Sequence, residues 1–141
     1  MYPTNVLLID GSDQQREYYA VRLIHISSDY VIHQAGSGEA GLALYKSQLI
    51  DCVVLEIDLP DMSGFALLVN LIPVVHRPKI AVIVLTRLFN PALLELAIKN
   101  GAQAALHKPM TSPAILEKAI RTAVNTVQRD TNSSLLQRTR S

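Results

Sequence analysis

Short apolar runs alternate along the chain with longer segments in which apolar residues recur at helical spacing. Three runs are continuously apolar, which is typical of strands buried on both faces of a parallel sheet; they span residues 6–9, 52–55 and 80–85. Residues 30–35 alternate apolar and polar side chains, as an edge strand does, and residues 104–107 form a weaker fifth run. The pattern therefore predicts five strands.

A helix is predicted after each strand from capping residues and apolar spacing. The expected first residues are Ser12 or Asp13, Ser37, Phe65, the pair Asn90-Pro91, and Thr111 or Ser112 before Pro113. The second helix should end near Gln48 and bury Ala40, Leu44 and Leu49. This alternation predicts an α/β fold with a doubly wound, five-stranded parallel sheet of strand order 2-1-3-4-5.

Four polar residues follow the predicted strands directly. Asp10 and Glu56 end the first and third strands, Thr86 ends the fourth, and Lys108 follows the fifth. Since ligand sites of open α/β sheets lie at the carboxyl ends of their strands, we expect these side chains to meet in one crevice.

Composition narrows the class of protein. The 141 residues are enough for one domain, and a net charge of +1 gives no reason to expect nucleic acid or a membrane surface as a partner. No apolar run approaches the ~20 residues of a membrane span, and no signal peptide is recognisable. The single cysteine, Cys52, lies in a buried run, which favours an inert core thiol and a cytoplasmic location.

The domain is predicted to comprise residues 1–128. Residues 129–141 are polar and show no periodicity, so we expect a disordered tail or a linker there.

The chain resembles the receiver domain of two-component response regulators, the CheY-like domains, over about residues 5 to 127. The matching segments are VLLID at residues 6–10, LEIDLPDMSG at 55–64, VIVLT at 82–86 and GAQAALHKPM at 101–110. The resemblance implies a flavodoxin-like (βα)5 receiver fold and a role in phosphorelay signalling rather than an enzyme activity. In such domains an aspartate ending the third strand accepts a phosphoryl group from a histidine kinase. Neighbouring acids hold Mg²⁺, and a hydroxyl and a lysine, here Thr86 and Lys108, contact the phosphoryl oxygens.

Three positions depart from that pattern. Glu56 stands at the phosphoacceptor position, Gly11 replaces a metal-binding acid, and Ala105 replaces the aromatic residue that rotates on activation. Glutamate is longer than aspartate by about 1.5 Å, which disturbs the in-line geometry of phosphoryl transfer. Two carboxylates opposed by Lys108 offer Mg²⁺ few ligands, so we expect weak or no Mg²⁺ binding and no other cofactor.

We therefore expect an atypical receiver, a signalling interaction module in which Glu56 mimics the phosphorylated state. Two alternatives stay open: a purely structural ion pair, and a low-efficiency phosphoacceptor that uses Glu56 or Asp58. A small flavodoxin-like binding enzyme is disfavoured because no glycine-rich phosphate loop is present. Asp13 is interpreted as a first-turn acid that could partly replace the missing acid in the pocket.

An apolar surface is predicted near the fourth helix. Leu93 and Leu96 lie off the stripe of Leu94, Ala97 and Ile98 that should face the sheet, and Leu88 and Phe89 precede them. The expected partners are signalling proteins, either a histidine kinase or an output domain, possibly in the same longer chain. A homodimer through the fourth helix, fifth strand and fifth helix is a further expectation.

Overall fold

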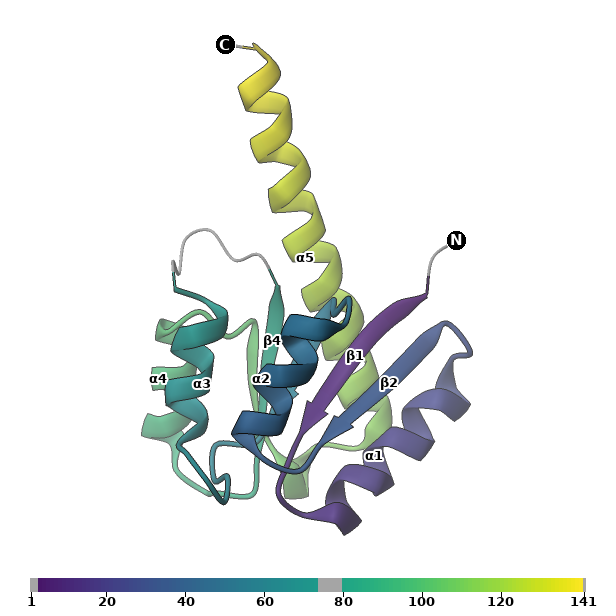
Figure 1. The fold of residues 1–141 in the computed structure, drawn as a ribbon, viewed down its shortest axis with the longest axis vertical. Coiled ribbons are helices and arrows are strands. Elements are labelled where there is room, and N and C mark those ends of the chain that lie inside the picture. Colours follow the sequence, from purple (N-terminus) through teal and green to yellow (C-terminus); the bar gives the residue numbers. More distant parts are fainter. Residues whose placement is uncertain (1–2, 74–79, 141) are drawn as a thin grey trace.

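A computed structural model describes residues 3–73 and 80–140 of the chain (Figure 1). The strands are β1 (Thr4–Ile9), β2 (Tyr30–Ala35), β3 (Cys52–Leu55), β4 (Ala81–Thr86) and β5 (Ala104–His107). The helices are α1 (Asp13–Ile26), α2 (Gly38–Ser47), α3 (Gly64–Leu71), α4 (Pro91–Lys99) and α5 (Pro113–Arg140), with a short 3-10 turn, η1 (Lys108–Met110), before α5. None of these helices is long and apolar enough to cross a membrane within the described residues.

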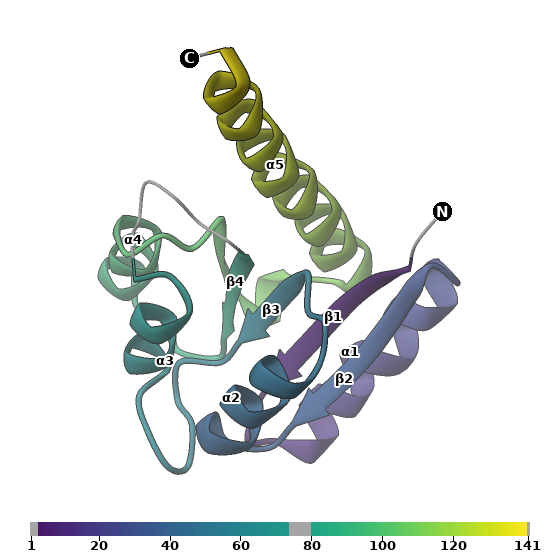
Figure 2. The same cartoon turned by 45° about the horizontal axis from the view of Figure 1, so that its top comes forward.

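The five strands form one parallel sheet in the order β2-β1-β3-β4-β5, which confirms the predicted fold class (Figure 2). Ile9 pairs with Leu55, and Leu55 pairs with Val84, so β1, β3 and β4 reach the same edge of the sheet nearly in register. The residues that follow them are therefore delivered to one place.

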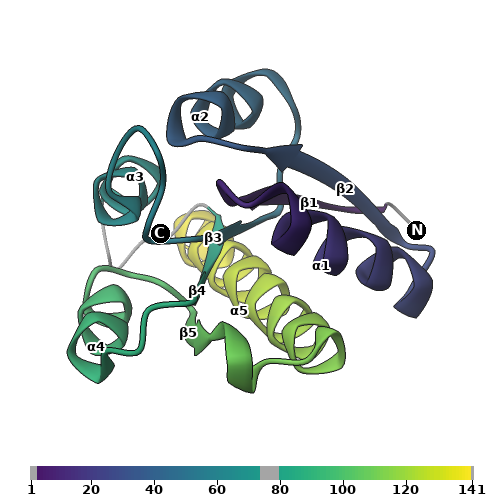
Figure 3. The same cartoon turned by 90° about the horizontal axis from the view of Figure 1, so that it is seen from below.

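Helices cover both faces of the sheet (Figure 3). On one face, α1 and α5 pack against β1, β3 and β4 through a cluster that includes Leu23, Leu116 and Ile120. On the other face, α2, α3 and α4 enclose a second cluster that includes Leu67 and Ala97. The central strands are thus buried on both sides, which explains their continuous apolar runs.

The buried face of α2 differs from the prediction. Leu49 is 87% exposed and Ala40 is exposed, whereas Leu44 is half-buried against the core. Because α2 ends at Ser47, Leu49 lies in the following loop rather than on the helix. Gly41 instead faces the sheet, where an added Cβ would lie 2.4 Å from Ile9 Cδ1.

The prediction of a disordered tail from residue 129 is wrong in its secondary structure. Helix α5 continues to Arg140 and is 28 residues long. No proline or glycine follows Pro113 in the sequence, so nothing interrupts the helix once it has formed. The assignment of this segment as a linker stays a prediction.

The loop between β3 and α3 is tied to the start of α2 by Asp61. Its carboxylate oxygens accept hydrogen bonds from the backbone N–H groups of Gly38 (2.8 Å) and Glu39 (2.9 Å). Asp61 thus caps a helix that lies more than twenty residues earlier in the chain, beside the Ser37 cap.

We expect Asp61→Asn to lower the melting temperature by a few degrees at pH 7. The N–H groups of Glu39 and Gly38 lower the pKa of Asp61, so its ionised form stabilises the folded state. This contribution is present above the unfolded-state pKa of about 4 and is lost as the pH falls through the lower folded-state pKa. The difference in melting temperature between wild type and variant should therefore shrink below about pH 4. An equal difference at pH 3 and pH 7 would contradict this.

Candidate functional site

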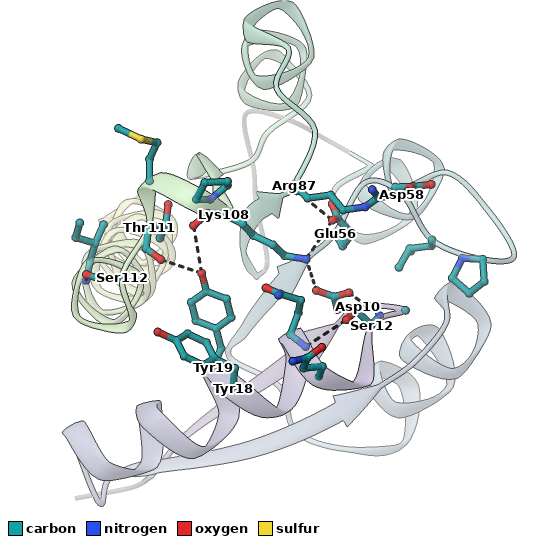
Figure 4. A pocket seen from close by; sticks show the side chains of 18 residues that line it. Asp10, Ser12, Tyr18, Tyr19, Glu56, Asp58, Arg87, Lys108, Thr111 and Ser112 are labelled. Carbon is teal, nitrogen blue, oxygen red and sulfur yellow. Dashed lines mark hydrogen bonds and ion pairs between the residues drawn. The ribbon is translucent and has the colours of Figure 1, made fainter.

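Three charged side chains meet at the carboxyl edge of the sheet, as the strand ends predicted. The Lys108 ammonium lies 2.5 Å from Asp10 Oδ2 and 3.1 Å from Glu56 Oε1 (Figure 4). All three residues are buried. One ammonium therefore compensates two carboxylates in a site with little access to water.

The Glu56 carboxylate is held from three sides. Oε2 accepts a hydrogen bond from the N–H of Ile57 (2.7 Å), and Oε1 accepts from the N–H of Arg87 (3.2 Å) as well as from Lys108. The residue is 2% exposed. Such charge-assisted bonds are stronger than neutral ones, so the carboxylate has a fixed orientation inside the pocket.

Asp10 is fixed by the turn that follows β1. Its Oδ1 accepts from the N–H of Ser12 (2.9 Å), and its backbone carbonyl accepts from Arg16 Nη1 (2.6 Å). Ser12 also caps α1 by accepting from the N–H of Gln15. The same turn therefore starts the helix and aims the Asp10 carboxylate at Lys108.

An open cavity of about 1160 Å³ lies over the charged cluster, between the start of α1 and the segment from η1 into α5. Arg87 and Asp58, which form an ion pair, line this cavity (Figure 4). On the other side, the Tyr19 hydroxyl donates to the carbonyl of Thr111 (2.8 Å). Burial raises the pKa of Tyr19, which keeps this donor protonated.

Two predicted pocket residues are not joined to the cluster. The Thr86 hydroxyl is buried and accepts from the N–H of Leu88 (3.1 Å), and no hydrogen bond between described residues links it to Glu56. Asp13 is in the first turn of α1 as expected, but its side chain is exposed and pairs with Arg16. Asp13 therefore does not replace the missing acid.

The residues present do not fit a Mg²⁺ ion of the kind that the family resemblance implies. Both carboxylates already share the Lys108 ammonium, and Gly11 contributes no side-chain oxygen. Within residues 3–73 and 80–140, no three His, Cys, Asp or Glu side chains gather closely enough to hold a metal ion. A Cβ added at Gly11 would also lie 3.0 Å from Pro60 Cδ, so an acid there would require the proline ring to shift.

The predicted apolar surface is only partly exposed. Phe89 is 82% and Leu96 is 44% exposed, but Leu88 and Leu93 are half-buried and pack against the core. Ile98, which was expected to face the sheet, is 47% exposed. Helix α4 is therefore rotated about its axis relative to the prediction. Leu93 and Ala97 face the core, and Leu96 faces outward.

The remaining predicted position, Ala105, lies in β5 opposite Val84 and is half-buried against the core. Sequence reasoning missed Arg87, whose backbone and side chain both reach the pocket. Its position directly after the strand-ending Thr86 was the signal that could have identified it.

Comparison with known proteins gives the family. The family model described as the response regulator receiver domain matches residues 6–121. The transcriptional regulatory protein UhpA of Salmonella typhimurium is 35% identical over 119 residues, which cover 83% of this chain and 57% of that protein. A probable cyclic di-GMP phosphodiesterase of Vibrio cholerae is 30% identical over 110 residues, or 78% of this chain and 24% of that protein. The match to protein CcdB of Bacillus subtilis is 29% identical and covers 84% of this chain and 96% of that protein.

Solved structures agree. The signal receiver domain of a putative LuxO repressor protein from Vibrio parahaemolyticus superposes with a TM-score of 0.82 at 21% identity, covering 94% of this chain and 98% of that one. CheY in the CheX–CheY–BeF3–Mg complex from Borrelia burgdorferi gives a TM-score of 0.73 at 27% identity, covering 86% and 89%. With the parallel sheet and the strand-end cluster, these matches show that the chain belongs to the response regulator receiver domain family of two-component signalling.

Proposed function

We propose that this receiver domain is an atypical one, a signalling interaction module that does not switch by accepting a phosphoryl group. The observation that carries the proposal is the state of Glu56. We assign Glu56 to the acceptor position; its carboxylate is almost fully buried and accepts from Ile57, Arg87 and Lys108. The oxygens of this carboxylate are already engaged in hydrogen bonds. They are therefore not oriented to attack the phosphorus atom of a phosphodonor.

Glu56 acts in this proposal as a permanent substitute for the phosphorylated state. Its Oε1 accepts hydrogen bonds from the N–H of Arg87, which follows β4, and from the ammonium of Lys108, which follows β5. One anionic oxygen therefore links the ends of β3, β4 and β5. The substitution is partial, because a carboxylate carries one negative charge where a phosphoryl group carries about 1.5–2. Thr86 is not part of this set: its hydroxyl accepts from the N–H of Leu88, and no hydrogen bond between described residues links it to Glu56.

The proposal makes a prediction about phosphorylation. Incubation with acetyl phosphate and Mg²⁺ should give no appreciable acyl phosphate by intact-protein mass spectrometry. Displacement of a reacting atom by ~1 Å can cost ~100-fold in rate, and the extra bond of glutamate exceeds that. The double variant Glu56→Asp with Gly11→Asp should be phosphorylated at least ~100-fold faster than the wild type.

Two controls make this test specific. Glu56→Asp alone should recover little, because the second metal-binding acid is still missing. Asp58 is the alternative acceptor, so Asp58→Asn is measured in parallel. A stoichiometric acyl phosphate on the wild type would contradict the proposal. If that acyl phosphate were lost in Asp58→Asn, the acceptor would be Asp58.

For the partner, we propose a signalling protein that contacts the exposed Phe89, in the loop before α4, and Leu96, on α4. CheY is found in complex with CheX in one similar structure, so a receiver of this fold can bind a separate protein. A homodimer through α4, β5 and α5 is the second candidate for this surface. The domain has no catalytic role in this proposal.

A further inference from the structure

Arg87 is tied to three different parts of the site. Its N–H donates to Glu56 Oε1 (3.2 Å), its guanidinium pairs with Asp58, and its carbonyl lies 3.2 Å from His107 Nε2. The peptide groups on either side of one residue therefore connect the buried carboxylate at the end of β3 with a ring on β5. Movement of Arg87 at one of these contacts changes the geometry of the others.

His107 has a defined orientation between Arg87 and Phe89. A carbonyl oxygen only accepts, so the hydrogen of the bond to Arg87 is on Nε2. The other ring nitrogen, Nδ1, is buried and has no hydrogen-bond partner among the described residues. Turning the ring over would put the Cε1–H group in the place of Nε2 and break the one hydrogen bond that the ring makes with the described residues.

The same ring contacts the exposed surface. The centroids of the His107 and Phe89 rings are 5.2 Å apart with the planes at 54°, a tilted aromatic contact. The backbone of His107 is fixed as well, because its carbonyl accepts from the Thr111 hydroxyl (2.8 Å) and the residue pairs with Thr86 across the sheet. A fixed ring thus lies between its hydrogen bond to the Arg87 carbonyl and a side chain that is 82% exposed.

We propose that His107 is a positioning residue that couples the Glu56 carboxylate to the Phe89 surface. The path runs from Glu56 Oε1 through the N–H and carbonyl of Arg87 to His107 Nε2, and from the imidazole ring to Phe89. His107 lies two residues beyond Ala105, on the same face of β5. The methyl group of Ala105 is too short to connect the pocket with the surface, whereas the imidazole ring of His107 makes that connection. This inference rests on the proposed function, because it assumes that the state of Glu56 is what the surface reports.

The sequence allows a sharp test, because it contains only two phenylalanines, Phe65 and Phe89. Fluorinated phenylalanine gives two fluorine NMR signals, with Phe65 on α3 as an internal reference. Glu56→Gln should shift the Phe89 signal and leave that of Phe65 nearly unchanged. In a His107→Leu background, which removes the N–H donor without adding a third phenylalanine, the Phe89 shift caused by Glu56→Gln should be at least about threefold smaller.

The matched control is His33, which also makes a side-chain bond through Nε2, to Asn5 Oδ1 (3.1 Å), but lies on β2. The Phe89 response should keep its full size in His33→Leu. A response that persists undiminished in His107→Leu, or no response of Phe89 in the wild-type background, would overturn the inference. Nitrogen NMR of the wild-type imidazoles gives an independent test: a His107 hydrogen on Nδ1 instead of Nε2 would also overturn it. None of these readouts depends on phosphorylation, so failure here is distinct from detection of an acyl phosphate.

Discussion

Lys108→Met is expected to lower the free energy of unfolding by about 3–5 kcal/mol, because it leaves two buried carboxylates without their counter-charge. For a domain of this size the melting temperature should fall by about 10–15 °C. Thermal unfolding followed by circular dichroism at pH 7 measures both quantities. Methionine matches the length of the aliphatic part of lysine, so loss of packing contributes little to the change.

The control is Lys118→Met, since Lys118 is exposed on α5 and should tolerate the change within about 0.5 kcal/mol. Adding Glu56→Gln to Lys108→Met removes one of the two orphaned charges and should recover part of the lost stability. A melting temperature for Lys108→Met equal to that of wild type would show that the charged cluster is not coupled to folding.

Gly64→Ala is expected to destabilise the domain by at least about 3 kcal/mol and to disturb Glu56 directly. An added Cβ would lie 2.6 Å from the Glu56 carbonyl oxygen and 2.6 Å from Ile57 Cα, both backbone atoms that cannot turn aside. The Gly64 N–H also donates to the Ile57 carbonyl (2.8 Å), which holds the start of α3 against the end of β3. Chemical denaturation measures the stability, and hydrogen exchange at the Ile57 N–H reports the loss of its bond to Glu56.

Gly36→Ala is the matched control for this effect. Its Cβ would meet Arg16 Nη1 at 3.4 Å, an ordinary contact with the end of a long side chain. The change should stay within about 0.5 kcal/mol of wild type. If the two alanine variants were equally stable, the close approach of α3 to the Glu56 backbone would not be a constraint on the fold.

The sheet and the strand-end cluster were predictable because local signals and the global fold agree. Continuous apolar runs occur only where both faces are covered, and this fixed the central strands and hence the meeting of Asp10, Glu56 and Lys108. Helix starts were equally accessible, since Ser37 and Asn90 cap α2 and α4 by hydrogen bonds to nearby N–H groups. These features depend on residues close in sequence or on a general rule of topology.

The features that could not be predicted depend on the rotation of a helix about its axis and on contacts between residues far apart in the sequence. A partial rotation of α4 about its axis is enough to exchange Leu93 and Ile98 between core and surface, and the apolar residues of this helix are spread too widely around it to fix that rotation. The direction of the Thr86 hydroxyl follows from the local path of the backbone to Leu88. The cap that Asp61 provides for α2 pairs residues more than twenty positions apart, which no local pattern records.

The length of α5 gives the domain a lever arm. Among the described side chains of α5, Val127 is the last buried one, and Figure 1 shows the C-terminal part of the helix projecting past the sheet. At ~1.5 Å per residue the helix is about 42 Å long, so a tilt of about 5° at Pro113 displaces Arg140 by about 4 Å. The start of α5 is close to the charged cluster, because Lys108 is the first residue of η1 and only the rest of η1, Thr111 and Ser112 separate it from Pro113. A change at Lys108 that tilted α5 would therefore be largest at the far end of the helix.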